Sequence, residues 1–327
     1  MATARKLTLS VCAILGSAVT AAAAGAEGGS AVPIERLSVR PTAFSRLLQI
    51  QTHPEQTHRS HENWGSVLTD IARRLPTTGT YQDAFIRYTR EGDLVTAGHE
   101  WTHFLNAYLS SRAGSGKSAF YMLEGRYVTL TIPDGLRGVV PHVPPSLRGV
   151  LYDLYLVQNS GNAQVDPLYL LDEWTAYAND VTIAVDQLNR GKPLNPFNPT
   201  AIQPEAAGNV LEFMFYGFAL GMAVKQYDPA YYQSYEGRRL RDFIALTAYR
   251  SLDIHAKGVR WREINRGDSR NTTLLSHFRN AADTAAMRAW VKSDLGEDLA
   301  RRLGIDTSAP TERRMALSHQ GQAPGLN

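Results

Sequence analysis

The stretch His99-Glu100-Trp101-Thr102-His103 decides how this 327-residue chain is interpreted. In a helix, its two histidines lie one turn apart on the same face. Their imidazoles can therefore converge on one tetrahedral Zn²⁺ and leave room for a further protein ligand and a water. Glu100 lies beside such a metal rather than on it, where a hydrolytic site needs its general base. The motif predicts a catalytic zinc site.

Apolar side chains around the motif predict that it lies in a mostly buried helix. They recur at helical spacing at Leu94, Val95, Ala97, Trp101, Phe104, Leu105 and Tyr108. Asp93 is a suitable N-cap, and Glu100 is the only charged residue from 94 to 109. The alternative is a core helix whose histidines are only hydrogen-bonded and whose Glu100 pairs with an Arg. That helix would have to bury three polar side chains and find a partner for each.

A third protein ligand must come from elsewhere in the chain. The metzincin peptidases need a Gly at the third and a His at the sixth position after the second histidine, where this chain has Asn106 and Leu109. The sequence does not contain the inverted H-x-x-E-H form either. What remains is the gluzincin arrangement, in which a Glu on a later helix completes the site, as in thermolysin. We expect Glu173 to be that ligand.

The segment around Glu173 has the pattern of a helix that begins near Asp166-Pro167. Its apolar positions are Leu170, Trp174, Tyr177, Val181 and Val185. One face carries Glu173, Ala176, Tyr177 and Asp180. Asp172 points about 100° away from Glu173, so we expect its removal to leave zinc binding nearly unchanged. The alternative carboxylate ligands are Glu124, Glu205, Glu212 and Glu236.

Two motifs resemble those of the gluzincin metallopeptidases. The stretch from Glu100 to His103 resembles the E-L-T-H core of thermolysin-like enzymes, and that from Glu173 to Ala176 resembles the Glu-x-x-Ala motif of CAAX-processing peptidases. The resemblance, which covers only these two short helices, implies a zincin-like fold with Glu173 as a zinc ligand. It also implies an Asp, four residues after that Glu, that orients a zinc histidine. Tyr177 holds this position, so the next acid, Asp180, is our candidate for the role.

Residues 1–26 have the pattern of a secretory signal peptide. Arg5 and Lys6 precede an apolar, Ala-rich run from 7 to 24 that ends in small residues suitable for cleavage. The alternative is an uncleaved anchor, for which the run is short and weakly hydrophobic. The only cysteine, Cys12, lies in this segment, so the exported chain has no disulfide. We expect a periplasmic or extracellular protein without stable membrane insertion.

The remaining chain is nearly neutral and long enough for one domain. Without residues 1–26 it has 32 basic and 31 acidic residues, a balance that points to neither nucleic acid nor a membrane surface as a partner. We expect a zincin-like domain over 27–305 and a disordered tail over 306–327. The apolar stretch from 210 to 224 is interrupted by Glu212 and too short to span a bilayer, so we expect a core helix.

Most of this domain has helical patterns, and the fold class we expect is α+β, mainly helical, with a small β-hairpin or sheet. Further predicted helices cover 62–75, 147–157, 204–226, 230–254 and 280–303. The clearest strand signal runs from 119 to 132 around Gly125 and predicts a hairpin. In a gluzincin, a strand that borders the cleft pairs with extended substrate, and this hairpin is our candidate for that edge.

These patterns predict an exported zinc metallopeptidase that acts on a peptide or protein substrate. His99, His103 and Glu173 would hold the Zn²⁺. Glu100 would accept a proton from the attacking water and return it to the leaving amine.

The oxyanion needs a hydrogen-bond donor besides the metal. Tyr177 is the first candidate, and His255 and His277 are alternatives. Two other functions also fit the sequence. One is a metallohydrolase of non-peptide substrates, and the other is a non-enzymatic exported helical protein with a structural or ligand-binding zinc pocket.

Overall fold

The computed structural model describes residues 48–77, 92–134, 138–159, 167–266 and 273–305, together with Ile86 and Gly161. All of them belong to one unit, Pro33–Asn327. The predicted signal peptide (1–26) and the predicted C-terminal tail (306–327) lie outside the described residues.

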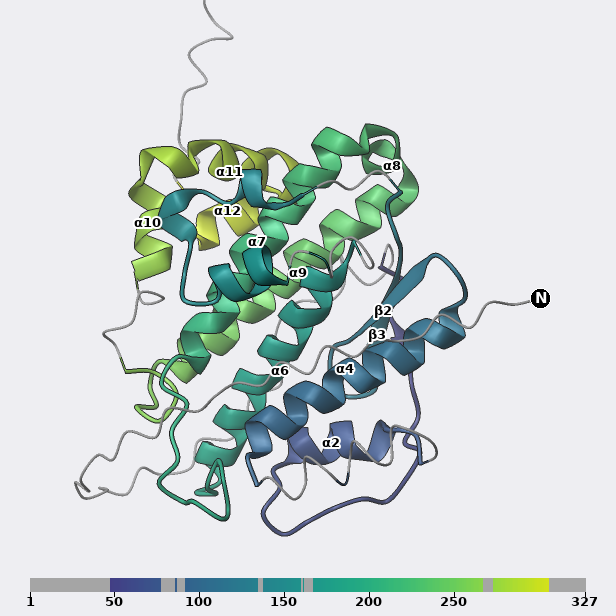
Figure 1. Cartoon of the computed structure of the whole chain (residues 1–327), viewed down its shortest axis with the longest axis vertical. Helices are drawn as coiled ribbons and strands as arrows, with labels where there is room; N and C mark the ends of the chain where they lie inside the picture. The colour runs from purple at the N-terminus through teal and green to yellow at the C-terminus, as the bar shows by residue number, and fades with distance from the viewer. Residues whose placement is uncertain are drawn as a thin grey trace, which may run out of the picture. The chain divides into compact units, whose positions relative to one another are not determined.

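Four long helices form the centre of this unit (Figure 1). They are α4 (Leu94–Ala113), α6 (Tyr169–Asn189), α7 (Ala206–Tyr227) and α9 (Tyr235–Gly258). Helix α4 packs on α6, α6 on α7, and α7 on α9. The predicted start of α4 is confirmed, because the Asp93 carboxylate accepts hydrogen bonds from the N–H groups of Val95 and Thr96. Helix α6 begins two residues after the expected Pro167.

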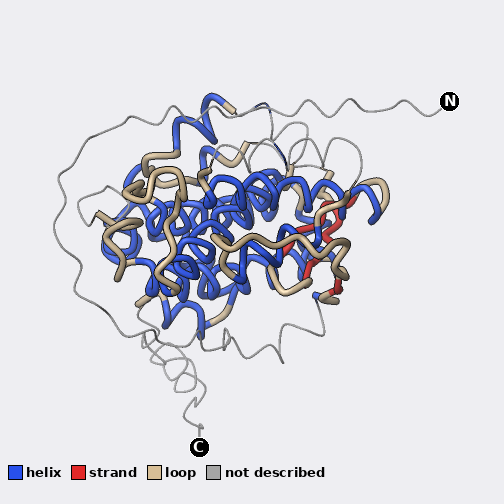
Figure 2. The backbone as a smooth tube through the Cα atoms, turned by 90° about the horizontal axis from the view of Figure 1, so that it is seen from below, coloured by secondary structure: helices blue, strands red, loops and turns tan. Residues whose placement is uncertain are grey.

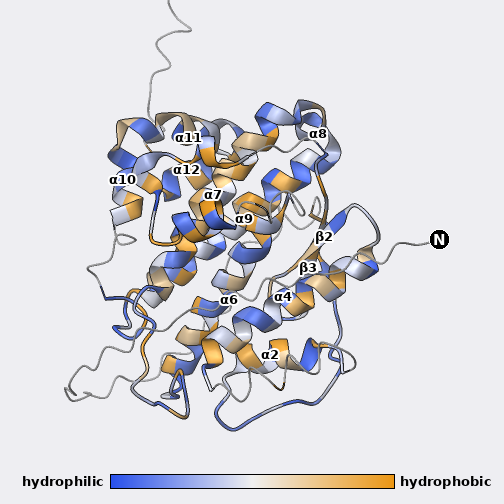
Figure 3. Cartoon of the chain, in the orientation of Figure 1, coloured by the Kyte–Doolittle hydropathy of each residue, from blue (hydrophilic) through white to orange (hydrophobic). Residues whose placement is uncertain are grey.

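Helix α7 is a core helix, as its sequence predicts. By length and composition alone it could cross a membrane, but 89% of its most apolar window is buried inside the molecule. Glu212 is buried within it and accepts hydrogen bonds from the Leu151 N–H and the Tyr216 hydroxyl. Figure 3 shows hydrophobic residues along α6, α7 and α9, whereas the loop between β1 and α2 is hydrophilic.

A three-stranded antiparallel sheet packs beside α4 and contains the predicted hairpin (Figure 2). Its strands are β1 (Gln51–Thr52), β2 (Lys117–Tyr121) and β3 (Arg126–Thr131), in the order β1-β3-β2. Leu123, Glu124 and Gly125 form the hairpin turn with positive φ. The Asp70 carboxylate holds this turn by accepting hydrogen bonds from the Glu124 N–H and the Tyr121 hydroxyl. A mainly helical α+β fold with one small sheet is therefore confirmed.

Shorter helices complete the unit, and some predicted long helices are broken. The short α-helices are α2 (Ser66–Arg74), α8 (Pro229–Gln233), α10 (Leu274–Asn280), α11 (Ala285–Trp290) and α12 (Glu297–Arg302). The predicted helix over 230–254 divides at Ser234, whose hydroxyl accepts a hydrogen bond from the Gly237 N–H and so begins α9. The predicted helix over 280–303 is interrupted where Ala281 is extended and where Gly296 has a φ of 104°.

Single turns account for the other departures from the sequence prediction. The 3₁₀ turns are Val140–His142, Pro145–Leu147 and Ala282–Thr284, and the π-helical turns are Asp153–Gln158 and Val291–Leu295. A regular helix over 147–157 is therefore wrong. These residues instead lie against α7, where the Glu212 carboxylate accepts a hydrogen bond from the Leu151 N–H.

Candidate metal centre

Helix α4 carries both motif histidines, and α6 runs antiparallel beside it. Gly98, near the start of α4, lies against Ile183 late in α6, whereas His103 reaches Asp172 early in α6. The helices approach closely, because a Cβ on Gly98 would lie 2.1 Å from the Cδ1 atom of Ile183. Directly before His99, α4 therefore lies against the Ile183 side chain of α6.

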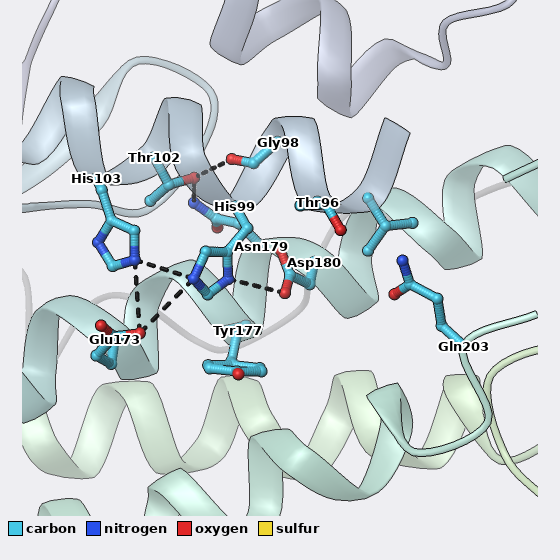
Figure 4. Close-up of polar contacts among 12 residues, drawn as sticks. Thr96, Gly98, His99, Thr102, His103, Glu173, Tyr177, Asn179, Asp180 and Gln203 are labelled. Atoms are coloured by element: carbon cyan, nitrogen blue, oxygen red, sulfur yellow. Dashed lines mark hydrogen bonds and ion pairs between the residues drawn. The ribbon is translucent and has the colours of Figure 1, made fainter. Parts of the chain in front are cut away.

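The side chains of His99, His103 and Glu173 converge on one point (Figure 4). The two Nε2 atoms are 2.9 Å apart, and the Glu173 Oε2 atom lies 3.6 Å from that of His99 and 3.5 Å from that of His103. A tetrahedral ion with bonds of about 2.0–2.1 Å holds its ligand atoms about 3.3 Å apart. The triangle is close to this size, so the three residues could hold a metal ion.

The atoms at the corners of this triangle can all act as metal ligands when the two imidazoles are neutral. The Nδ1 atom of His99 is 3.0 Å from Asp180 Oδ2, and that of His103 is 2.8 Å from Asp172 Oδ2. Ionised carboxylates only accept, so each Nδ1 donates a hydrogen and each Nε2 of a neutral imidazole keeps a lone pair. The buried Oε2 of Glu173 pairs with the Nε2 atoms of both imidazoles, at 3.6 Å from His99 and 3.5 Å from His103. A metal ion between the three atoms would take the place of the protons that the imidazoles otherwise hold.

The two aspartates differ from expectation in one respect. Asp180 contacts a motif histidine, His99, as the sequence analysis anticipated. Asp172, predicted to point about 100° away from Glu173 and to matter little for zinc, also reaches the centre, since its carboxylate accepts a hydrogen bond from the Nδ1 atom of His103. Its direction on α6 does differ from that of Glu173. However, α4 crosses α6 on this side, so His103 lies between the two carboxylates.

Asn106 connects Asp172 to the sheet. Its Nδ2 atom donates to Asp172 Oδ1 at 2.6 Å, and its Oδ1 atom accepts from the N–H of Tyr121 in β2 at 2.7 Å. A continuous chain of hydrogen bonds therefore runs from β2 to His103. Neither Asn106 nor Asp172 was assigned this role from the sequence. The available signal was the place of Asn106 three residues after His103, on the same helix face.

The charges at the centre favour a cation. Burial opposes protonation of His99, but Asp180 outweighs it and raises the pKa to about 10. Burial also opposes protonation of His103, whose pKa Asp172 and Glu173 raise above its usual range. For Glu173, burial raises the pKa, yet the imidazoles, His103 first, lower it to about 2. Three carboxylates around two imidazoles thus attract positive charge, whether protons or a metal ion.

Glu100 follows His99 on α4 and is half-buried. Within the part of the chain that the structure describes, its carboxylate has no hydrogen-bond or ion-pair partner. The alternative in which Glu100 pairs with an Arg is therefore wrong for the described residues. This carboxylate, one residue after His99 on α4, is therefore available for proton transfer.

Tyr177 lies beside the triangle on α6. Its ring meets His99 edge-on, 4.8 Å between centroids, and stacks on Phe213 at 4.6 Å. Its hydroxyl is 3.0 Å from that of Tyr155. Burial first, and then the charge of Glu173, raise the pKa of both phenols, so both keep their hydrogens. One of the two phenolic hydrogens forms the hydrogen bond between the hydroxyl groups. The other phenolic hydrogen has no acceptor among the described residues.

The alternative residues from the sequence lie elsewhere. The Nδ1 atoms of His255 and His277 bond to the carbonyl oxygens of Ala207 and Ser146, at 2.8 and 3.0 Å. The alternative glutamates have other places: Glu124 pairs with Arg126, Glu212 bonds to Tyr216, Glu236 pairs with Arg239, and Glu205 is the N-cap residue of α7. Glu173 is the glutamate that the fold brings to the two histidines.

The outer edge of β2 is already occupied. On one side β2 pairs with β3, with Ala119 opposite Thr129. On the other side, the N–H of Ala119 donates to the Ser110 hydroxyl and that of Tyr121 donates to the Asn106 side chain. Both acceptors lie on α4, so this helix covers the edge. The expectation that this hairpin offers an edge to extended substrate is therefore wrong for β2.

Comparison with known proteins adds no relative. No family model, curated protein or solved structure matches this chain.

Proposed function

We propose that this protein is an exported zinc-dependent metallopeptidase with a zincin-like domain and a gluzincin-type site. The observation that carries the proposal is the triangle of His99, His103 and Glu173, with a carboxylate behind each imidazole. Two imidazoles and one carboxylate are the protein ligands of one class of catalytic zinc sites, which keep a water in the fourth position. Carboxylates behind ligating histidines fix the ring orientation and raise the basicity of the metal-binding nitrogen.

Access to the triangle supports a catalytic rather than a structural metal. The side chains of His99, His103 and Glu173 remain 12%, 16% and 10% exposed. A structural zinc is closed by four protein ligands, whereas a hydrolytic zinc needs an open position. Three protein ligands leave one position of a tetrahedral ion unfilled, which favours the hydrolytic case, and Glu100 without a partner among the described residues favours it further.

Each step of the hydrolysis has a residue to carry it. Bound zinc would lower the pKa of a water to about 7 and polarise a carbonyl. Glu100 accepts a proton from the attacking water as its oxygen bonds to the scissile carbon. Glu100 then returns that proton to the leaving nitrogen, which departs as an amine. The unshared hydrogen of the Tyr177–Tyr155 pair donates to the carbonyl oxygen as it gains negative charge.

The test combines metal analysis with a peptide assay. We expect the purified protein, prepared without chelators, to contain about one zinc per chain and to cleave members of a quenched fluorescent peptide library. Glu100→Gln should keep the zinc and lose hydrolysis by about 100-fold or more, because the general base is gone. Glu297→Gln, the same change at an exposed position on α12, is the matched control.

Each other outcome has a definite meaning. A protein without tightly held metal would overturn the proposed centre, and full activity of Glu100→Gln would overturn its role as the base. A protein that holds zinc but cleaves no peptide would leave the two alternatives, a hydrolase of other substrates or a structural zinc.

A further inference from the structure

Arg250 is a buried cation on α9 that the metal centre does not use. It is 6% exposed, and its Nη2 atom donates a hydrogen bond of 2.5 Å to the side-chain oxygen of Asn179. Among the described residues, neither its Nε nor its Nη1 atom has an acceptor. A guanidinium stays charged in proteins, and burying it with one neutral partner is strongly unfavourable.

A second buried arginine on the same helix shows how such a charge is usually satisfied. Arg239 is 7% exposed, donates to the carbonyl oxygens of Leu48 and Thr129, and forms an ion pair with Glu236 at 2.9 Å. Arg250 has no ion pair and no backbone acceptor among the described residues. The difference indicates that Arg250 is placed for a partner that comes from outside the described chain.

A further guanidinium lies near Arg250. The Asn179 side chain that accepts from Arg250 also donates to the Tyr121 carbonyl oxygen at 3.5 Å, and Tyr121 is paired with Tyr127, the residue after Arg126 in β3. Burial, with the charge of Arg126 next in size, lowers the pKa of Arg250 to about 10. The Nε atom of Arg126 is also buried without an acceptor in the described part of the chain. The rest of the Arg126 side chain reaches the surface, where it is 37% exposed and pairs with Glu124 at 2.9 Å.

Neither Glu124 nor Tyr121 neutralises the charge of Arg250. Glu124 acts on its charge from a distance, but this carboxylate is bonded to Arg126 and its side chain is 68% exposed. The Tyr121 hydroxyl is committed to Asp70. Two like charges therefore stand near each other with buried N–H groups unused, an arrangement that an anion between them would stabilise.

We propose that Arg250 and Arg126 form a binding site for a small oxyanion such as phosphate, sulfate or a carboxylate. Hydrogen bonds from guanidinium groups to ionised oxygens are about twice as strong as neutral ones. The Asn179 side chain that accepts from Arg250 also donates to the Thr102 hydroxyl at 3.0 Å. Thr102 lies on α4, so the anion would bind near the helix that carries the two histidines.

The site can be tested by thermal unfolding of the full chain in different anions at matched ionic strength. We expect phosphate, as the probe, to raise the Tm of the wild type by at least about 2 °C over chloride. Sulfate and acetate arms show which oxyanion fits best. Arg250→Met should abolish the shift, because the buried cation is gone. Arg238→Gln, an exposed arginine on α9, is the control and should keep the full shift.

A second variant guards against a failure of Arg250→Met to fold. Arg126→Gln changes a partly exposed side chain and should weaken phosphate binding about tenfold in a calorimetric titration. His103→Ala should bind phosphate as the wild type does, which separates this site from phosphate at the metal centre. The proposal is overturned if the wild type responds to the oxyanions as it does to chloride, or if Arg250→Met and Arg126→Gln respond like the wild type. No readout requires zinc or hydrolysis, so the result is independent of the proposed peptidase activity.

Discussion

The two histidines of the metal centre are held in different ways, although both project from α4 towards carboxylates of α6. The partner of His103 is Asp172, whose side chain is 29% exposed and which Asn106 ties to β2. The partner of His99 is Asp180, whose side chain is 11% exposed and whose Oδ1 atom has no hydrogen bond to any described residue. One imidazole thus depends on a network open to water, and the other on a single buried contact.

This difference shows why two imidazoles of one motif need not tolerate the same changes. Water can replace part of what Asp172 provides, because that carboxylate is already partly solvated. At Asp180 the contact is shielded, so a lost acceptor leaves the His99 Nδ1 donor buried and unsatisfied. The His99 side should therefore be the more sensitive of the two.

Removal of the ligand common to both sides should have the largest effect. Glu173→Ala deletes the carboxylate that faces both Nε2 atoms, so we expect zinc affinity to fall by more than about 100-fold. Competition with a chromophoric chelator measures the constant, and circular dichroism checks that α6 is intact. Zinc binding at wild-type strength in this variant would mean that the triangle is not the metal site. The different surroundings of His99 and His103 would then have no bearing on metal binding.

The pH dependence of zinc affinity tests the charge around His99. Because Asp180 outweighs burial and raises the pKa of His99 to about 10, the metal-free imidazole is protonated below that pH. Zinc must displace this proton, so its affinity should rise with pH, by about tenfold per unit for each proton released, up to about pH 10. Chelator-buffered titrations at pH 6, 7 and 8 give the slope. A flat profile would contradict the assigned charge.

The two aspartates provide the direct comparison. Asp180→Asn should lower zinc affinity towards the upper end of the 10- to 100-fold range for residues that orient a ligand, and Asp172→Asn towards the lower end, about tenfold. Both changes preserve shape and remove one charge, so each controls for the other. A larger loss in Asp172→Asn would show that the network to β2, rather than the buried contact, dominates.

The smallest effect on the metal is expected at Asn106. Asn106→Ala leaves Asp172 in place, so zinc affinity should change only a few-fold. It also leaves the buried Tyr121 N–H without its acceptor, which should cost about 1–3 kcal/mol in the free energy of unfolding. Urea denaturation measures this. Ser111→Ala, at an exposed position on the same helix, should cost less than about 0.5 kcal/mol.

Local sequence patterns predicted part of this centre well. His99, Glu100 and His103 follow from spacing within one helix, and the N-cap at Asp93 follows from the preference of helix starts for such residues. The contact of Glu173 with the histidines could also be predicted. A buried carboxylate is unfavourable unless it pairs with a cation or binds a metal ion.

The remainder depends on how helices cross, which periodicity does not specify. Asp172 occupies the expected phase of α6, yet it reaches His103 because α4 packs on this side of α6. The break between α10 and α11 likewise depends on a side-chain contact rather than on helical periodicity. The Arg288 guanidinium donates to the carbonyl oxygens of Phe278 and Ala281, groups that a continuous helix would have used internally. No pattern within the segment signals that contact.

The covered edge of β2 has a consequence for the behaviour of the protein at high concentration. Ser110 and Asn106 occupy backbone donors that would otherwise invite a strand from a second molecule. The helix that carries His99 and His103 thus also covers the edge at which another molecule's strand could pair. Loosening α4, by heat or by loss of its packing on α6, would expose a template for intermolecular strand pairing, so inactivation and self-association should occur together.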